Sequence, residues 1–172
     1  MDKPETDKYK NKLVPEYEKL FNNIHNEKLK ILEIGVLHGE GLEYLQLLFP
    51  NSTIYGGDIV VPDTKFKVFA CDQNDPSSLI KIVNDVGPFD IIIDDGCHIM
   101  DATMTTFDAL WPHTKMYVIE DWIAHYWGPP YNGILDTVLH IVKNKTELGI
   151  KEINLILKEP RCSLAYFSKL IN

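Results

Sequence analysis

Two apolar runs that each end in acidic residues constrain the fold of this 172-residue chain most strongly. The first is FDIIIDDGCH, residues 89–98, and the second is YVIEDW, residues 117–122. Runs rich in β-branched residues predict strands that are buried on both faces, as in parallel sheets. Ligands of open α/β sheets bind just beyond the carboxyl ends of such strands. If the two strands are neighbours, the acids meet at one edge of the sheet, where a cation, a proton or solvent must relieve the negative charge.

The composition is that of an ordinary globular domain. Hydrophobic residues make up 45% of the chain and charged residues 24%, which excludes a disordered chain and provides for a substantial core. We expect residues 1–172 to form a single domain without an interdomain linker. The formal net charge of −8 and the pI near 5.2 argue against nucleic acid and against an anionic membrane surface as partners.

The cysteines and the N-terminus indicate a cytoplasmic protein. Cys71, Cys97 and Cys162 form an odd set without metal-ligand spacing, which is typical of a reduced environment. The first five residues contain no apolar leader segment, and no apolar run reaches the length of a membrane span.

Strand-like and helical patterns alternate along most of the chain. The predicted strands span residues 30–36, 52–58, 66–71, 89–94 and 116–120, and residues 153–157 and 163–167 form a predicted closing hairpin. The predicted helices span residues 13–25, 42–49, 76–86, 100–111 and 134–142, and residues 1 to about 11 are expected to be loosely held. This order predicts an α/β fold with a Rossmann-like, doubly wound, mostly parallel sheet of about seven strands and a C-terminal antiparallel hairpin.

A glycine-rich turn follows the first predicted strand. Gly35, Gly39 and Gly41 allow the backbone to approach a ligand closely and to begin the next helix. The spacing Glu33-x-Gly35-x-x-x-Gly39 differs from the G-x-G-x-x-G fingerprint of NAD-binding domains, and it suits a cofactor without a pyrophosphate. The alternative is that these are ordinary turn glycines.

Two further acids stand at the ends of the second and third predicted strands. Asp58 is placed to accept hydrogen bonds from ribose hydroxyls, and Asp72 is placed to contact an adenine amino group. The alternative for each acid alone is a solvated strand end. Together with the glycine turn, at successive strand ends in the right order, they predict a nucleoside-binding half of a site.

The acids that end the two opening runs favour a hard cation. Asp95 from one strand end, with Glu120 and Asp121 from the other, offers carboxylate oxygens without a nearby cysteine, a set that suits Mg²⁺, with Mn²⁺ and Ca²⁺ as alternatives. The competing interpretation is that Asp94 or Asp95 caps the helix that follows.

His98 lies three residues beyond Asp95, at the mouth of the predicted site. A neutral imidazole there is placed to deprotonate a substrate hydroxyl whose pKa a metal has lowered. The alternative is a solvent-facing histidine in the first turn of a helix. An aromatic loop follows the second acid pair, and its Trp122, Tyr126 and Trp127 either line a pocket for a ring or sugar or serve as ordinary loop packing.

Several of these segments resemble a known family. Residues 31–59, ILEIGVLHGEGLEYLQLLFPNSTIYGGDI, resemble the opening of class I S-adenosylmethionine-dependent methyltransferases. The segments FACDQNDPSSL, FDIIIDDGCH, LWPHTKMYVIEDW and HYWGPPYNG are similar to the metal-dependent macrolide-sugar O-methyltransferases and their cephalosporin-hydroxylase-like relatives. The resemblance covers nearly the whole chain from about Tyr9 onward.

The resemblance implies a role for each matching residue. It implies that Asp95, Glu120 and Asp121 bind Mg²⁺ and that His98 is the catalytic base. It also implies an S-adenosylmethionine site lined by the following residues: Glu33, Gly35, Asp58, Asp72 and Gln73. We predict that Gly39 of the glycine-rich turn belongs to the same site and that Asp94 is a structural or cofactor-side acid.

The chain departs from the family pattern in three places. Cys97 stands where the family usually has serine, and residues 112–115 lack the Pro-Gly-Gly that usually precedes the fifth strand. The macrolide enzymes also carry an extra N-terminal domain that helps to enclose the substrate, where this chain has one short predicted helix. The acceptor therefore does not transfer from the resemblance, and a homo-oligomer in which a second subunit closes the site is a further expectation.

The leading hypothesis is an S-adenosylmethionine-dependent, Mg²⁺-assisted O-methyltransferase that acts on a hydroxyl of a small molecule such as a sugar or polyol. The first alternative is a module that binds S-adenosylmethionine or a nucleoside without catalysis. The second is an NAD-dependent oxidoreductase, which the missing G-x-G-x-x-G spacing disfavours.

Overall fold

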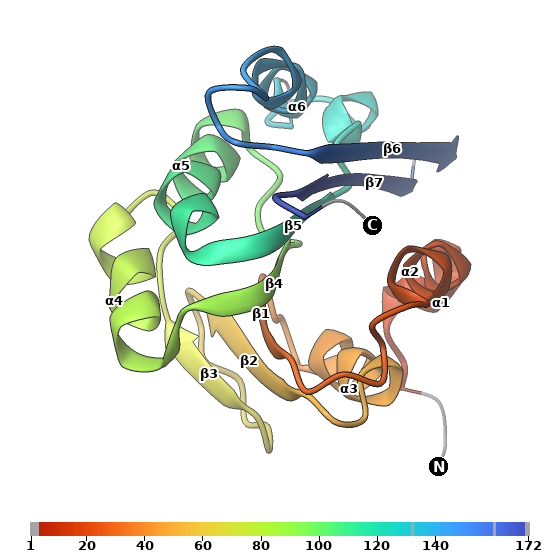
Figure 1. Ribbon diagram of the computed structural model, residues 1–172, viewed down its shortest axis with the longest axis vertical. Helices are drawn as coiled ribbons and strands as arrows, with labels where there is room; N and C mark the ends of the chain where they lie inside the picture. The colour runs from red at the N-terminus through yellow and green to blue at the C-terminus, as the bar shows by residue number, and fades with distance from the viewer. Residues whose placement is uncertain (1–3, 132, 160, 171–172) are drawn as a thin grey trace.

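A single sheet organises the computed structural model, which describes residues 4–131, 133–159 and 161–170 (Figure 1). Within these residues the strand order is β3-β2-β1-β4-β5-β7-β6. The strands are β1 (Lys30–Ile34), β2 (Thr53–Asp58), β3 (Lys67–Ala70), β4 (Phe89–Asp94), β5 (Thr114–Glu120), β6 (Glu152–Glu159) and β7 (Cys162–Ser168).

The first five strands are parallel, and β7 pairs antiparallel with both β5 and β6. The parallel pairs β1–β2 and β4–β5 are each joined by a connection that contains a helix, whereas β6 and β7 form a hairpin at the end of the described chain. The predicted fold class, a mostly parallel sheet of seven strands with a C-terminal antiparallel hairpin, is confirmed.

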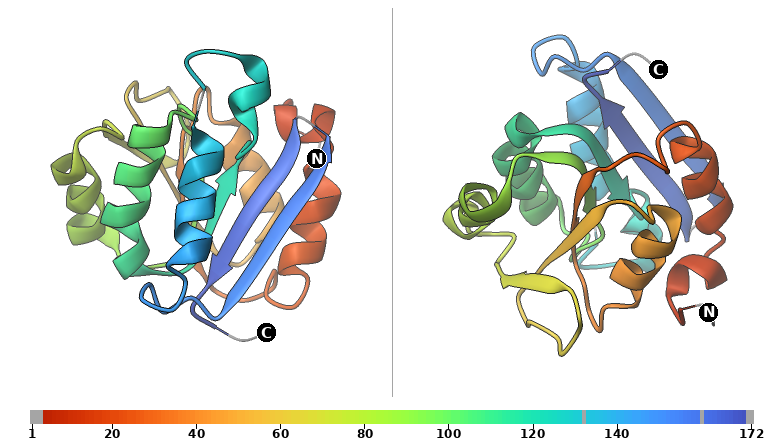
Figure 2. Two further views of the ribbon diagram at one scale, coloured as in Figure 1. Left: turned by 90° about the horizontal axis from the view of Figure 1, so that it is seen from above. Right: turned by 60° about the horizontal axis from the view of Figure 1, so that its bottom comes forward.

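Helices cover both faces of the sheet, as Figures 1 and 2 show. One face carries α4 (Pro76–Val86), α5 (Met100–Leu110) and α6 (Ile134–Lys143), and the other carries α1 (Asp7–Lys10), α2 (Val14–Phe21) and α3 (Glu40–Leu48). Two short 3₁₀ turns, η1 (Trp111–His113) and η2 (Ala124–Trp127), flank β5. None of the described helices is long and apolar enough to cross a membrane.

The apolar run of β4 explains why the sheet has a core on each face. Ile92 packs in the cluster under α4, α5 and α6, while Ile91 and Ile93 pack in the cluster under α2 and α3. All three side chains are fully buried, because successive residues of a strand point to opposite faces. Burial of one such side chain stabilises the fold by about 1.5–3 kcal/mol.

The N-terminal segment differs from its prediction. Residues 4–11 were expected to be loosely held, but Asp7–Lys10 forms α1 and Lys8 is only 1% exposed. The Thr6 side chain caps this helix by accepting a hydrogen bond from the Lys8 backbone N–H at 3.4 Å. The next helix is also shorter than predicted, since α2 spans Val14–Phe21. Charge pairing by Lys8 with buried acids, described below, holds the segment against the sheet.

The carboxyl ends of the central strands lie in register. Ile34 of β1 stands beside Asp94 of β4, which stands beside Ile119 of β5. The segments that follow these three strands therefore meet at one edge of the sheet, which is where the sequence places its acids.

Candidate active site

Four acids gather at this edge, and we call Glu33, Asp95, Glu120 and Asp121 the acid cluster. Glu33 comes from β1, Asp95 directly follows β4, and Glu120 with Asp121 ends β5. Glu33 and Glu120 are each 1% exposed, Asp121 is 5% exposed, and the Asp95 side chain is 21% exposed. Buried carboxylates at this density require compensating positive charge or protonation.

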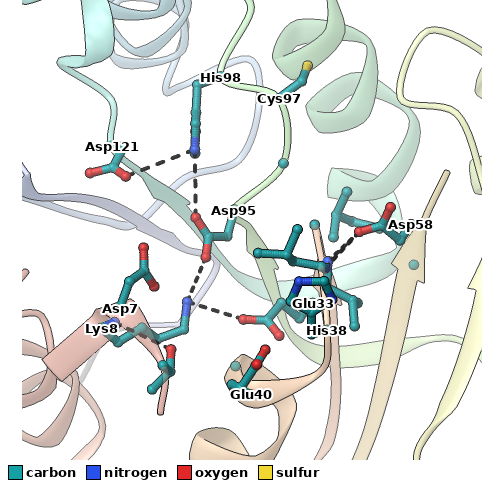
Figure 3. A pocket seen from close by; sticks show the side chains of 18 of the residues that line it. Asp7, Lys8, Glu33, His38, Glu40, Asp58, Asp95, Cys97, His98 and Asp121 are labelled. Atoms are coloured by element: carbon teal, nitrogen blue, oxygen red, sulfur yellow. Dashed lines mark hydrogen bonds and ion pairs between the residues drawn. The ribbon is translucent and has the colours of Figure 1, made fainter. Parts of the chain in front are cut away.

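A lysine that the sequence did not single out supplies part of that charge. The Lys8 ammonium lies 2.5 Å from Glu120 Oε1, 2.7 Å from Asp95 Oδ2 and 3.2 Å from Glu33 Oε1. Figure 3 shows it pointing between Asp95 and Glu33. Although burial opposes its charge, these carboxylates raise the pKa of Lys8 well above its usual value, so it remains an ammonium ion.

A second contact that the sequence did not reveal comes from α2. The Tyr17 hydroxyl donates a hydrogen bond of 2.6 Å to Glu120 Oε1, the same oxygen that Lys8 holds. Tyr17 is fully buried, and its helical spacing marked it only as a core residue. Lys8 and Tyr17 both lie more than 100 residues from Glu120 along the chain, so no local sequence pattern predicts these contacts.

His98 stands on the opposite side of the cluster from Lys8. Its Nε2 is 3.8 Å from Asp95 Oδ1 and 4.0 Å from Asp121 Oδ2 (Figure 3). The side chain is 13% exposed, and the ring of Trp127 meets it edge-on at 5.6 Å between centroids. The solvent-facing alternative for His98 is therefore wrong. Burial lowers the pKa of this imidazole, which favours the neutral form near pH 7.

Backbone conformation and hydrogen bonding mark Asp121 as unusual. Its φ of 51° lies in the left-handed region, as does that of His98 at 54°, and non-glycine residues held there concentrate at functional sites. Among the described atoms, the buried Asp121 Oδ1 has no hydrogen-bond partner. Burial, assisted by the charges of Glu120 and Asp95, raises the pKa of Asp121 to about 8. A nearby positive charge would stabilise the ionised form of this carboxyl group.

The acid cluster and His98 together offer two sets of ligand atoms close enough to share a cation. Asp95, His98 and Asp121 form one set, and Glu33, Asp95 and Glu120 form the other, with the atoms of each set within 4.8 Å of one another. The Lys8 ammonium contacts all three residues of the second set. The oxygen donors and the unpartnered Asp121 Oδ1 fit a hard divalent cation such as Mg²⁺.

Neither Asp94 nor Asp95 caps the helix that follows them, because the N-cap of α5 is Ile99 and no side chain caps that end. Asp94 has a different role. Its Oδ1 accepts a hydrogen bond from Gln73 Nε2 at 2.9 Å and its Oδ2 accepts one from the Tyr117 hydroxyl at 3.1 Å. Gln73 Oε1 in turn accepts the Cys97 backbone N–H at 2.8 Å. Asp94 and Gln73 thus anchor the segment that carries Asp95 and His98.

A cavity of about 790 Å³ opens beside the acid cluster, large enough for a nucleoside cofactor and a small acceptor. Predicted site residues that line it are Glu33, Gly35, Asp58, Asp72, Gln73, Asp95, His98, Asp121 and Trp127. The N-terminal segment, from Glu5 to Asn11, contributes another wall, and Arg161 lies at 6.0 Å from the Trp127 ring. Sequence reasoning missed both of these contributions.

Five predicted site residues do not line the cavity. Glu120 is buried where Lys8 and Tyr17 contact it, and Asp94 is buried against Gln73. The remaining three are Gly39, Trp122 and Tyr126. Gly39 is the N-cap of α3, and Tyr126 is 69% exposed. The Trp122 indole N–H donates a hydrogen bond of 3.2 Å to the Ile156 carbonyl oxygen. Trp122 therefore takes part in core packing, which was the alternative considered for the aromatic loop.

Asp58 holds the glycine-rich turn in shape. Its Oδ2 accepts the backbone N–H groups of Val36 at 2.7 Å and Leu37 at 3.0 Å, while its Oδ1 accepts that of Val60 at 3.1 Å. A carboxylate has about four acceptor positions, so capacity for a ribose hydroxyl remains. Gly35 is required in this turn, because its φ is +89° and a Cβ atom there would lie 2.1 Å from Asp95 O.

Comparison with known proteins agrees with this geometry. No family model matches the chain. The chain is 38% identical to the mycinamicin VI 2''-O-methyltransferase of Micromonospora griseorubida over 136 residues and 37% identical to the demethylmacrocin O-methyltransferase of Streptomyces fradiae over 136 residues. Each match covers 71% of this chain and 34% of the relative, so the chain spans about a third of the length of these curated relatives.

Solved structures give the same result. The MycE methyltransferase of the mycinamycin biosynthetic pathway, in complex with Mg and SAH, superposes with a TM-score of 0.73 at 31% identity, covering 91% of this chain and 49% of MycE. A second MycE structure, which also contains mycinamycin VI, superposes with a TM-score of 0.72.

The fold and the acid-lined edge define a domain of the class I methyltransferase type. Within that class, the predicted resemblance of this chain to the metal-dependent macrolide-sugar O-methyltransferases is confirmed.

Proposed function

We propose that this chain is an S-adenosylmethionine-dependent, Mg²⁺-assisted O-methyltransferase that acts on a hydroxyl group of a sugar or a similar small molecule. The observation that carries the proposal is the buried, unpartnered Asp121 Oδ1 beside Asp95 and His98, at the edge of a cavity of about 790 Å³. The relatives with 37–38% identity are named as O-methyltransferases of mycinamicin VI and demethylmacrocin, and one with 32% identity is named as a 2'-O-methyltransferase of a rhamnosyl tetracenomycin, which supports a sugar hydroxyl as the acceptor.

The acid cluster is the proposed metal site. Asp95, Glu120 and Asp121 would hold Mg²⁺, whose positive charge would lower the pKa of an acceptor hydroxyl. Glu120 is the least accessible of the three at 1% exposure, and both hydrogen bonds described for its carboxylate are to Oε1. Burial raises the pKa of Asp121 to about 8, and the positive charge of a bound cation would favour its ionised form instead.

His98 is the proposed base. Its burial keeps the imidazole neutral near pH 7, so Nε2 is free to accept the proton of an acceptor hydroxyl. Trp127 packs edge-on against His98 and limits the directions in which that ring faces the cavity. Trp127 would therefore form the acceptor wall, whereas Trp122 and Tyr126, the other aromatic residues predicted for this wall, lie outside the cavity.

The opposite wall of the cavity is the proposed cofactor site. Glu33, Gly35, Asp58, Asp72 and Gln73, which line the cavity, would contact the cofactor. Asp94 would support them through Gln73, and Gly39 would shape the turn that begins α3. S-adenosylmethionine would supply the methyl group there. The chain's own contribution is to place the donor on one side of the cavity and the deprotonated hydroxyl on the other, so that catalysis is mostly positioning.

The setting proposed for this activity is cytoplasmic, with a small hydroxylated acceptor as the partner. Cys71 and Cys162 are buried as free thiols and Cys97 is an exposed free thiol, in keeping with a reducing compartment. A homo-oligomer in which a second subunit completes the acceptor wall remains part of the proposal.

The test measures S-adenosylhomocysteine formation with a panel of sugar and macrolide-glycoside acceptors, before and after chelation. Turnover should stop when divalent cations are removed and should return with Mg²⁺. Asp121→Asn should reduce turnover at least 100-fold, since it removes a charged ligand. Asp136→Asn, which neutralises an exposed acid on α6, is the matched control and should leave turnover unchanged.

Two outcomes would contradict the proposal. Turnover that is indifferent to the chelator would remove the metal from the mechanism. Tight binding of S-adenosylmethionine in calorimetry, without Mg²⁺ binding and without turnover on any acceptor, would instead favour a binding module.

A further inference from the structure

Lys8 is buried at the centre of a site that is built to hold a cation. It is 1% exposed, and its three carboxylate partners come from β1, from the segment after β4 and from β5. A buried ion pair of this kind carries a large desolvation cost, so it is weak as a source of stability alone. Its location in the proposed metal site calls for a functional account.

The contacts divide the oxygens of the cluster between two sides. Lys8 Nζ holds Asp95 Oδ2 and Glu120 Oε1, and Tyr17 donates to the same Glu120 oxygen. The other oxygen of Asp95, Oδ1, points toward His98 Nε2, as does Asp121 Oδ2 (Figure 3). Asp95, which lines the cavity, is therefore held at one oxygen by Lys8 and directs the other toward His98, whereas Glu120 is held by Lys8 and Tyr17 behind the cavity wall.

We infer that Lys8 is a positioning residue for the metal site: its ammonium holds Asp95 Oδ2 and Glu120 Oε1, and so fixes the orientation in which these two carboxylates would meet a divalent cation. The inference rests on the proposed function, because it assumes that the acid cluster binds that cation. Hydrogen bonds from surrounding groups to ligating carboxylates commonly set both ligand geometry and metal affinity.

Lys8 also ties the two halves of the cavity together. Its contact with Glu33 reaches the strand that leads into the glycine-rich turn, while its contacts with Asp95 and Glu120 reach the residue after β4 and the last residue of β5. The same residue anchors the N-terminal segment that lines the cavity from Glu5 to Asn11. Lys8 therefore connects the N-terminal wall of the cavity to the proposed cofactor site through Glu33 and to the proposed metal site through Asp95 and Glu120.

Two physical effects predict opposite changes in cation affinity when Lys8 is removed. A Coulomb effect alone predicts tighter cation binding, because a positive charge near the cation disappears. A positioning role predicts weaker binding, because the carboxylates lose their fixed orientation. Mg²⁺ requires near-octahedral geometry whereas Ca²⁺ tolerates irregular coordination, so the loss should be larger for Mg²⁺.

The experiment is a calorimetric titration of Mg²⁺ and of Ca²⁺ into the full chain, without cofactor or acceptor. Lys8→Met should weaken Mg²⁺ binding by about 10–100-fold and Ca²⁺ binding by less, so that the ratio of the two affinities falls. Lys8→Arg, which keeps the charge and donors, should recover part of the loss. Lys19→Met, which removes an exposed lysine from α2, should bind both cations as the wild type does.

Two outcomes would overturn the inference. An unchanged ratio of Mg²⁺ to Ca²⁺ affinity in Lys8→Met would reduce Lys8 to a structural ion pair, and tighter Mg²⁺ binding would identify it as a competitor of the cation. If Lys8→Met does not fold, Lys8→Gln keeps one donor of similar size in the buried position and is read by the same ratio. Wild-type protein that binds no Mg²⁺ would overturn the proposed function itself, which distinguishes that failure from a failure of Lys8 alone.

Discussion

The proposed cofactor wall, which includes the glycine-rich turn and Asp58, lies on the same edge of the sheet as the acid cluster, but different contacts hold the two in place. On the cofactor wall, Asp58 bonds to backbone N–H groups of the turn that precedes its own strand, 21 and 22 residues away. In the acid cluster, Lys8 reaches across 87 residues to Asp95 and across 112 to Glu120. The first arrangement is a property of one strand–turn–helix unit, and the second exists only when the N-terminus docks on the finished sheet.

This difference explains how each half tolerates change. The cofactor wall uses backbone groups and glycines, so steric changes should damage it most. The acid cluster uses buried charges, so changes of charge or of hydrogen bonding should damage it most. The four predictions that follow test this contrast, from the largest expected effect to the smallest.

His98→Ala should impair the chemistry at the acid cluster and leave cofactor binding intact. Turnover should fall by about 10²–10⁴-fold, because the proposed proton acceptor is gone. Binding of S-adenosylmethionine should stay within about twofold of wild type, since His98 lies on the acid side of the cavity. Steady-state kinetics and calorimetry on the same preparation provide both numbers. Retention of full activity would show that His98 is not the base.

Gly35→Ala should damage both halves at once. The added Cβ would stand 2.1 Å from the Asp95 carbonyl oxygen at a φ of +89°, so the turn and the segment after β4 must move apart. We expect a loss of stability of about 3 kcal/mol or more, measured by chemical denaturation. Gly149→Ala is the control for positive φ alone, because the structure shows open space around its Cβ position at a φ of +69°. Equal losses in the two variants would mean that contact with Asp95 is unimportant.

Asp94 should make stability depend on pH. Burial raises the pKa of Asp94 to about 7 in the folded state, above the unfolded value of about 3.9. The protonated carboxyl therefore favours folding below about pH 4, and this contribution is lost as the pH rises through about 7. Asp94→Asn should remove this dependence, which amounts to about 2–4 kcal/mol. Denaturation of both proteins at pH 5 and pH 8 measures it, and identical changes in the two proteins would exclude Asp94 as its source.

Tyr17→Phe should produce the smallest effect. It removes one buried hydrogen bond of 2.6 Å to Glu120 and leaves the ring packing in place. We expect a loss of about 1–3 kcal/mol in the free energy of unfolding, with cofactor binding unchanged. Tyr55→Phe is a matched control, because Tyr55 packs on Phe69 and Phe89 on the other side of the sheet. A loss of cofactor affinity in Tyr17→Phe would show that the two halves are coupled more strongly than the contacts suggest.

Much of the fold was predictable because its signals are local. Successive side chains of residues 89–94 pack into two different cores, one on each face of the sheet. A strand buried on both faces needs a continuous apolar, β-branched run, and the sequence shows such a run. Because the acids follow predicted strands, the sequence also predicts that Asp95, His98 and Asp121 lie at one edge of the sheet, as they do. Asp94 also received a structural or cofactor-side role from sequence, and its hydrogen bonds to Gln73 and Tyr117 give that role a physical form.

The errors have a common cause. A charged N-terminus with few apolar residues was expected to be loosely held, because sequence reasoning assigns lysines to the surface. Lys8 is buried because three carboxylates surround it, and none of these lies within 20 residues of it. Tyr126 was expected to face the cavity because it follows the acids in the sequence, yet its loop turns it toward solvent.

The sequence by itself determined which chemistry is present: a glycine-rich turn, strand-end acids and one histidine next to them, in the order that a parallel sheet brings to one edge. Tertiary structure alone decided how the charges are shared. Parallel strands align their ends through backbone hydrogen bonds that any sequence of this pattern can form, whereas the partner of a buried charge is selected by the packing of distant segments. The acid-tipped strands are therefore visible in the sequence, and the lysine that holds their carboxylates is visible only in the fold.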